Sequence, residues 1–292
     1  MAALLPLVAT AADQPLAGAR FETQKELIFA DFLVNGVKVN LVVDSGSSRC
    51  ILDIEKAKQL GLNIDKVALT SGPHTVSGPI EVRIAEGVVY QLGDVRVTAP
   101  ITVVYSLDFL TKRVGRQVDG IVGFRAFEAF VLDLDYLKHE IRVHRPDAFT
   151  EPANARAVPL EIGPSGLRVA GKIYPTLNSP AIDGEFGVDT GASGVDVVLW
   201  KPCAERKEIA AAARIDDTVD SISFGGERKA QQGRLGRLTV GEVVITDPTV
   251  RFTDVFSSGD VPSSLCGNLG SGFLGRFNAV FDFPHGKLWL AQ

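Results

Sequence analysis

The chain has 292 residues, 46% of them hydrophobic, which is enough for about two compact domains and excludes a disordered chain. The net charge is −5, and Lys and Arg are scattered, so we expect no nucleic acid partner and no anionic membrane surface as a partner. No apolar run reaches the roughly 18 residues of a membrane-spanning helix, so no membrane span is expected.

The first residues form a segment of their own. Residues 2–12 are apolar and alanine-rich and end in Ala9-Thr10-Ala11, as in the second part of a secretion signal, although a basic start is missing. We expect residues 1–16 to be a signal remnant or a disordered tail outside the fold. The protein is then exported, to the periplasm or the medium; it is cytoplasmic if this run is not a signal.

The next part of the chain predicts mainly antiparallel strands. Apolar residues alternate with polar ones, as at Val88, Tyr90 and Leu92. A single helix interrupts these strands, because Asp53 can cap its start and Gly61 can end it. One half of the chain therefore reads as strands with one short helix.

A change in composition marks the middle of the chain. The proline-rich stretch 145–166 interrupts the strand pattern, so we place a boundary near residue 155 between domains 17–154 and 155–292. In the second domain, Pro202 suits the first turn of a helix, and the alanine-rich stretch 204–213 can continue it. Each domain thus has one predicted helix.

The same acidic turn occurs in both domains. One apolar strand leads into Asp44-Ser45-Gly46-Ser47-Ser48, and another leads into Asp189-Thr190-Gly191-Ala192-Ser193. Further matches follow in the same order, namely Leu92-Gly93-Asp94 with Val240-Gly241-Glu242, and Ile121-Val122-Gly123 with Phe273-Leu274-Gly275. The offset grows from 145 residues at the aspartates to 152 at Gly123 and Gly275. The chain therefore reads as two copies of one domain.

Paired carboxyls at equivalent points of two copies suggest acid–base chemistry. A two-fold axis would bring Asp44 and Asp189 face to face, and two adjacent carboxyls cannot both ionise cheaply. The charged member can act as a base and the neutral one as an acid, and the sequence leaves open which is which. The hydroxyls of Ser45 and Thr190 can join the two turns. Other repeated acidic pairs lack the glycine continuation and are interpreted as structural: Asp133 with Asp282, and Asp94 with Glu242.

The two acidic turns, each followed by an apolar-apolar-Gly step, resemble the aspartic protease superfamily. The short halves are similar to single-chain tandem retropepsin-like proteins. The resemblance implies an all-β fold of two pseudo-symmetric β-barrel lobes with a short helix in each, and an active cleft between the lobes. It also implies that Asp44 and Asp189 are catalytic. The supporting residues are then the rest of the two turns, Ser45, Gly46, Ser47, Thr190, Gly191 and Ala192.

The family covers its cleft with a hairpin flap, and two segments occupy the matching places. These candidate flap and substrate-binding residues are Thr75, Val76, Ser77 and Gly78 in the first half and Phe224 and Gly225 in the second. Neither segment has the tyrosine of pepsin-type flaps. We therefore predict hairpins there and leave their chemistry open.

These observations predict an aspartic endopeptidase that hydrolyses peptide bonds with a water activated between two aspartates. The alternative is a catalytically silent, protease-like peptide-binding protein. The partner in both cases is a peptide or protein, no cofactor or metal is expected, and one chain suffices as a monomer. Cys203 and Cys266 form a disulfide if the protein is exported, or all three cysteines are simply buried. Because Ala192 replaces the hydroxyl of Ser47, we expect fewer hydrogen bonds to the dyad and a mildly acidic activity optimum.

Overall fold

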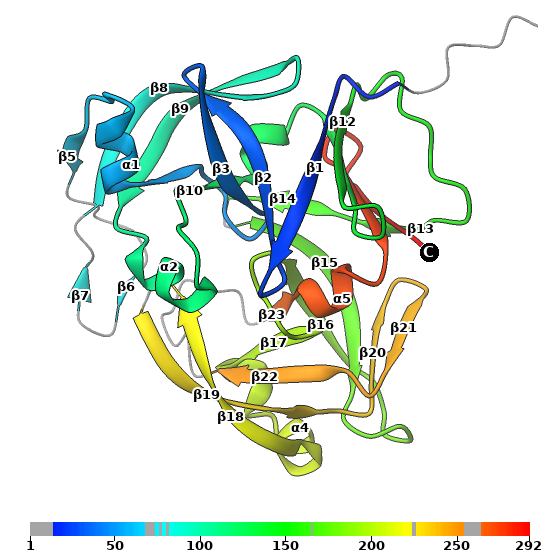
Figure 1. Cartoon of the computed structure of the whole chain (residues 1–292). Coiled ribbons are helices and arrows are strands. Elements are labelled where there is room, and N and C mark those ends of the chain that lie inside the picture. Colours follow the sequence, from blue (N-terminus) through cyan, green and yellow to red (C-terminus); the bar gives the residue numbers. More distant parts are fainter. Residues whose placement is uncertain are drawn as a thin grey trace, which may run out of the picture.

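The protein is described by a computed structural model of mostly β-structure. It covers residues 14–67, 74–75, 78–79, 82–164, 166–223, 226–253 and 264–292. Two lobes of similar topology meet along a shared sheet, with the first lobe uppermost in Figure 1. No helix in these ranges is long and apolar enough to cross a membrane. The predicted all-β, two-lobed class is confirmed.

The first lobe is a closed barrel of six strands. In order around the barrel these are β2 (Leu27–Val34), β3 (Val37–Asp44), β10 (Gly120–Gly123), β4 (Ile51–Asp53), β9 (Val95–Tyr105) and β8 (Val82–Leu92), which pairs again with β2. The short β5 (Asp65–Val67) extends β8. Alternation along β3 buries Leu41 and Val43 in the main core, whereas Val42 packs in a separate apolar cluster on the other face. β3 therefore has apolar contacts on both faces and ends at Asp44.

The second lobe repeats these pairings. Its strands are β15 (Gly166–Tyr174), β16 (Ile182–Val188), β23 (Leu265–Leu269), β17 (Val197–Trp200), β22 (Thr249–Thr253), β19 (Gly226–Arg234), β18 (Arg214–Ser223), β20 (Arg237–Val240) and β21 (Val243–Thr246). The parallel pairs β16–β23 and β17–β22 match β3–β10 and β4–β9 of the first lobe. The hairpin glycines also match, since Gly93 and Gly241 have φ angles of 53° and 54°.

A six-stranded sheet joins the lobes. In order it contains β13 (Arg156–Pro159), β25 (Lys287–Ala291), β24 (Asn278–Asp282), β11 (Val131–Asp135), β12 (Glu140–His144) and β1 (Ala17–Gln24), while β14 (Glu161–Gly163) pairs with β15. At the centre, Leu132 lies opposite Phe281. On either side of this pair, Val131 lies opposite Asp282 and Asp133 lies opposite Val280. The pseudo-two-fold axis therefore passes through the Leu132–Phe281 pair.

The helices agree only partly with the sequence. Helix α1 (Ile54–Gln59) starts where predicted, and Asp53 Oδ1 accepts a hydrogen bond from Glu55 N at 2.9 Å. The single helix predicted in the second lobe is instead two, α3 (Lys201–Ala204) and α4 (Lys207–Ala212), because Arg206 between them has an extended ψ of 130°. Helices α2 (Asp108–Val114) and α5 (Ser271–Leu274) and the 3-10 turn Phe124–Phe127 were not predicted. Each follows a strand within its lobe.

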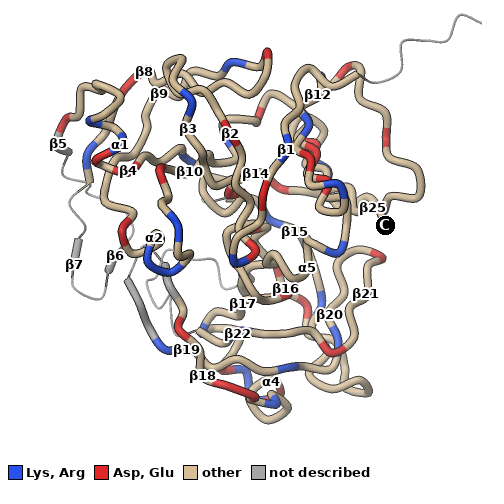
Figure 2. The backbone as a smooth tube through the Cα atoms, viewed as in Figure 1, with Lys and Arg blue, Asp and Glu red and all other residues tan. Residues whose placement is uncertain are grey.

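Charged residues are spread over the backbone trace of both lobes (Figure 2), whereas two of the three cysteines are joined in one lobe. Basic and acidic positions are interspersed over both lobes (Figure 2). Cys203 on α3 and Cys266 on β23 form a disulfide, while Cys50 is buried and free. Of the two interpretations of the cysteines, the structure therefore has the disulfide.

The structure corrects one pairing of the sequence repeat. Phe124 N donates to Ser47 O at 2.9 Å, and Ser271 N donates to Ala192 O at 3.0 Å in the same way. Gly123 therefore corresponds to Gly270, and the predicted match with Gly275 is wrong. The counterpart of Ile121-Val122-Gly123 is Asn268-Leu269-Gly270, whose first residue is polar. Both glycines are required, because a Cβ on Gly123 would lie 2.6 Å from Ser47 O and one on Gly270 would lie 2.7 Å from Val195 O.

Candidate active site

The two predicted aspartates meet at the junction of the lobes. Asp44 ends β3, and Asp189 follows β16. A Cβ on Gly191 would lie 2.7 Å from the Asp44 carboxyl carbon, and a Cβ on Gly46 would overlap the Asp189 carboxyl. Each lobe therefore places its glycine against the carboxyl of the other lobe. Glycine is needed at both positions for this close approach.

A reciprocal set of hydrogen bonds joins the turns. Ser45 N donates to Thr190 Oγ1 at 2.9 Å, and Thr190 N donates to Ser45 Oγ at 3.0 Å. Each hydroxyl then donates into the opposite strand, Ser45 to Val188 O at 2.8 Å and Thr190 to Val43 O at 2.9 Å. Both side chains are buried. The hydroxyls thus connect the turns across the pseudo-two-fold axis in the way the sequence predicts.

The carboxyls also accept hydrogen bonds from within their own lobes. Gly46 N donates to Asp44 Oδ1 at 2.8 Å, and Gly191 N donates to Asp189 Oδ1 at 2.9 Å. Asp189 also accepts a hydrogen bond from a side chain, because Asn268 Nδ2 donates to Asp189 Oδ2 at 2.7 Å. Within the described residues, Asp189 is therefore the aspartate of the pair that accepts from a neutral side chain.

This arrangement contradicts the hydrogen-bond premise of the expectation built on Ala192, while the mildly acidic optimum itself stays a prediction. Ser47 Oγ donates to Arg49 O at 2.8 Å, so that hydroxyl does not serve Asp44. The side-chain donor is present on the Ala192 side instead, because Asn268 supplies it from β23. The premise that the turn with Ala192 gives its aspartate fewer side-chain hydrogen bonds is therefore wrong.

The environment separates the two carboxyls electrostatically. Burial, and then the charge of Asp189, raise the pKa of Asp44 to about 8. Burial also raises the pKa of Asp189, but hydrogen bonds from Asn268, Gly191 N and Asp44 act to lower it. Both residues keep intermediate solvent exposure, so protein surrounds the carboxyls without sealing them. The hydrogen bonds to Asp189 therefore favour its ionised form, whereas burial and the charge of Asp189 favour the neutral form of Asp44.

Sequence reasoning missed two tyrosines that interact electrostatically with the dyad and a glutamate that joins the lobes. Burial and Glu26, and then Asp189, raise the pKa of Tyr136, whose hydroxyl has no hydrogen-bond partner among the described residues. Burial and the nearby Asp44 likewise raise the pKa of Tyr105. Glu26 belongs to the turn between β1 and β2, and its Oε2 accepts from Ser271 Oγ at 2.6 Å. No local pattern marks these residues, because the fold brings them together from distant parts of the chain.

The candidate flap segments lie at hairpin ends. β6 (His74–Thr75) and β7 (Gly78–Pro79) pair with Thr75 opposite Gly78. In the second lobe, β18 and β19 pair up to Ser223 opposite Gly226. Val76 with Ser77 and Phe224 with Gly225 lie outside the described residues. Their contact with substrate stays a prediction.

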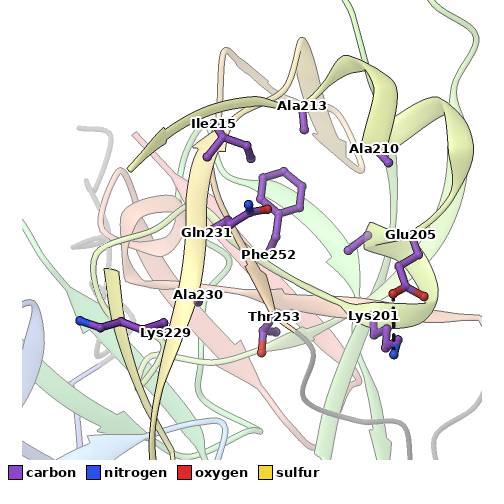
Figure 3. Close-up of a pocket in the computed structure, with 11 residues that line it drawn as sticks. Lys201, Glu205, Ala210, Ala213, Ile215, Lys229, Ala230, Gln231, Phe252 and Thr253 are labelled. Atoms are coloured by element: carbon purple, nitrogen blue, oxygen red, sulfur yellow. Dashed lines mark ion pairs between the residues drawn. The ribbon is translucent and has the colours of Figure 1, made fainter. Parts of the chain in front are cut away.

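A separate cavity of about 400 Å³ lies in the second lobe, between helices α3 and α4 and strands β18, β19 and β22 (Figure 3). Ile215 and Phe252 form part of its apolar wall. Its two ammonium groups are paired, Lys201 with Glu205 and Lys229 with Asp220. Neither Asp44 nor Asp189 lines this cavity, so it is distinct from the candidate active site.

The fold and the paired carboxyls define an acid-protease class, and the comparisons agree. The sequence matches the family described as aspartyl protease over residues 30–126 and 176–275, one match in each copy. The chain therefore belongs to the aspartyl protease family. The crystal structure of the aspartic proteinase from Irpex lacteus is similar in fold, with a TM-score of 0.55 and 14% identity over 94% of this chain and 96% of that chain. No curated protein sequence is detectably similar.

Proposed function

We propose that the protein is an aspartic endopeptidase in which Asp44 and Asp189 activate a water molecule. The observation that carries this proposal is the pair of carboxyls facing each other across the lobe junction, with the pKa of Asp44 raised to about 8. One neutral and one charged carboxyl can deprotonate the attacking water and protonate the peptide carbonyl in the same step. The family membership supports the same reaction class.

The substrate is an extended peptide or protein segment that binds between the lobes. Such a segment would add to strand edges through main-chain hydrogen bonds. We propose that the paired hairpins at Thr75 and Gly78 and at Ser223 and Gly226 close over it. Because one chain supplies both aspartates, a monomer is sufficient for activity.

We also infer that the protein is exported to the periplasm or the medium. The Cys203–Cys266 disulfide supports this, because disulfides persist mainly in oxidising compartments. Cell fractionation tests it, combined with thiol labelling of freshly isolated protein. Reduced Cys203 and Cys266 in a soluble cytoplasmic fraction would contradict export.

Peptide-library digestion across about pH 3 to 8, with and without pepstatin, tests the proposed reaction. We expect cleavage by the wild type and a loss of about 100- to 10,000-fold in Asp44→Asn and Asp189→Asn, since each removes one member of the acid–base pair. Asp94→Asn is the matched control, because Asp94 is exposed in the β8–β9 hairpin. Equal activity in all three variants would refute the assignment.

The second candidate is a silent peptide-binding protein, favoured by the lack of a pepsin-type tyrosine in both flap segments. It predicts binding without turnover. Calorimetry with library-selected peptides separates the two functions, because a silent receptor binds them equally before and after prolonged incubation and releases no fragments.

A further inference from the structure

The two lobes differ at one pair of positions behind the aspartates. In the first lobe, Val42 on β3 is paired in register with Ile121 on β10, and both are buried in one apolar cluster. In the second lobe, the corresponding register pair is Gly187 on β16 and Asn268 on β23. Val42 and Gly187 each lie two residues before an aspartate. An apolar pair in one lobe is therefore replaced by a glycine and an amide in the other.

The two replacements depend on each other. Asn268 Nδ2 reaches Asp189 Oδ2 at 2.7 Å, and Asn268 is only half-buried. A Cβ on Gly187 would overlap Asn268 Oδ1. The missing side chain at Gly187 therefore makes the room that the amide needs in order to face Asp189.

Among its described residues, the first lobe offers Asp44 no equivalent side-chain donor. The hydrogen bonds that act on the Asp44 carboxyl come from the backbone of Gly46 and Ser47 and from Asp189 itself. Its counterpart of Asn268 is the apolar Ile121. The dyad is thus symmetric in its backbone and asymmetric in one side chain.

In the described part of the chain, three other titratable groups act near the aspartates or bridge the lobes beside them, and none donates a side-chain hydrogen bond to one aspartate as Asn268 does. Tyr136 is coupled to Asp189, and Tyr105 is coupled to Asp44. Burial raises the pKa of both phenols, so both stay neutral where the aspartates titrate. Glu26 reaches the second lobe through Ser271 Oγ and Gly194 N rather than through either aspartate.

We propose that Asn268 is a positioning residue that holds the negative charge of the dyad on Asp189, which makes Asp189 the base and Asp44 the acid. This inference rests on the proposed endopeptidase function. Asp189 takes a proton from the attacking water as the new carbon–oxygen bond forms, and Asp44 gives its proton to the carbonyl oxygen. When the carbon–nitrogen bond breaks, Asp189 returns its proton to the nitrogen and Asp44 recovers one from the intermediate hydroxyl. The dyad then regains its starting state.

The test removes the amide without opening a void. Asn268→Leu substitutes an apolar side chain of similar size, and the double variant Gly187→Val with Asn268→Ile rebuilds the apolar pair of the first lobe. The control is Asn40→Leu, because the Asn40 amide donates to Asp31 Oδ1 at 2.8 Å on the exposed surface. The double variant keeps the test valid if the single substitution impairs folding.

Two measurements are made on the wild type and on each variant. Carbon-13 NMR titration of labelled aspartate carboxyls gives the two apparent pKa values of the dyad without needing turnover, and Asp44→Asn assigns the resonances. The pH profile of kcat/KM gives the apparent pKa of its acidic limb. A hydrogen bond to a charged group corresponds to about one to two pKa units, so we expect the lower apparent pKa and the acidic limb to rise by about that amount. At a pH well below the optimum, kcat/KM then falls about 10- to 100-fold.

The outcomes are distinguishable. An unchanged lower pKa in both Asn268 variants, or an equal shift in Asn40→Leu, would overturn the inference. If the NMR shift is found and no peptide is cleaved, the placement of the charge stands and the endopeptidase function fails. If the wild type cleaves peptides and the acidic limb does not move in the variants, the function stands and the role of Asn268 is refuted.

Discussion

Thr190→Val gives a direct measure of the hydrogen bonds that join the two lobes. Thr190 is fully buried, and its hydroxyl accepts from Ser45 N and donates to Val43 O. Valine has nearly the same shape but neither hydrogen-bonding function, so the variant leaves a buried N–H of the first lobe without its acceptor.

The expected loss of stability follows from these contacts. A buried polar group left unpaired costs about 1–3 kcal/mol, and the lost bond to Val43 O adds about 1 kcal/mol, so the free energy of unfolding falls by about 3 kcal/mol. With an unfolding entropy of about 2 cal/mol/K per residue, this lowers the Tm by about 5 °C. Activity falls as well, because the carboxyls lose a fixed separation.

The assay is differential scanning calorimetry combined with kcat measurement. Thr190→Ser is the control, since it keeps the hydroxyl and loses one buried methyl group, worth about 0.8 kcal/mol. A double-mutant cycle with Ser45→Ala gives the coupling between the two hydroxyls, which we expect to exceed about 0.5 kcal/mol. A Tm for Thr190→Val within 1 °C of that for Thr190→Ser, on the order of the experimental error, would refute the reasoning.

Three further predictions follow from the site and the disulfide. The pKa of Asp44 is about 8 in the folded protein and 3.8 in the unfolded chain, so the free energy of unfolding of the wild type falls as pH rises from about 4 to about 8. The Tm of Asp44→Asn minus the Tm of the wild type should therefore increase over this pH range, and a constant difference would contradict the argument. Gly46→Ala should abolish peptide cleavage with little change in circular dichroism, because its Cβ overlaps the Asp189 carboxyl, whereas Gly18→Ala meets only ordinary contacts and should be active. Replacing Cys203 and Cys266 by serine opens a loop of 63 residues and should cost about 4 kcal/mol in urea unfolding; unchanged unfolding midpoints would show that the bond adds nothing.

The sequence predicted the parts of the site that occur in both copies. Asp44 and Asp189, together with the hydroxyls of Ser45 and Thr190, were found because each residue has a partner at the same offset. Asn268 was missed for the opposite reason. It replaces an apolar residue, so matching the copies by apolar character placed the second glycine at Gly275 instead of Gly270.

The fold shows a similar limit. Strands with clear alternation and the Asp53-capped helix were predictable because their signals are local. The break between α3 and α4, and the approach of Glu26 and Tyr136 to the second lobe, depend on contacts between segments far apart in the chain. Such contacts leave no periodic pattern in one sequence.

The reciprocal register around Leu132 and Phe281 has a consequence for how the two halves can diverge. Each lobe offers the same strand edge to the other, which is the isologous contact of a two-fold homodimer. In a true homodimer every substitution appears twice, so an amide facing one carboxylate would face both. Covalent linkage removes that constraint. It lets a single chain carry Gly187 and Asn268 on one side and Val42 and Ile121 on the other, and so distinguish two aspartates that symmetry would make equivalent.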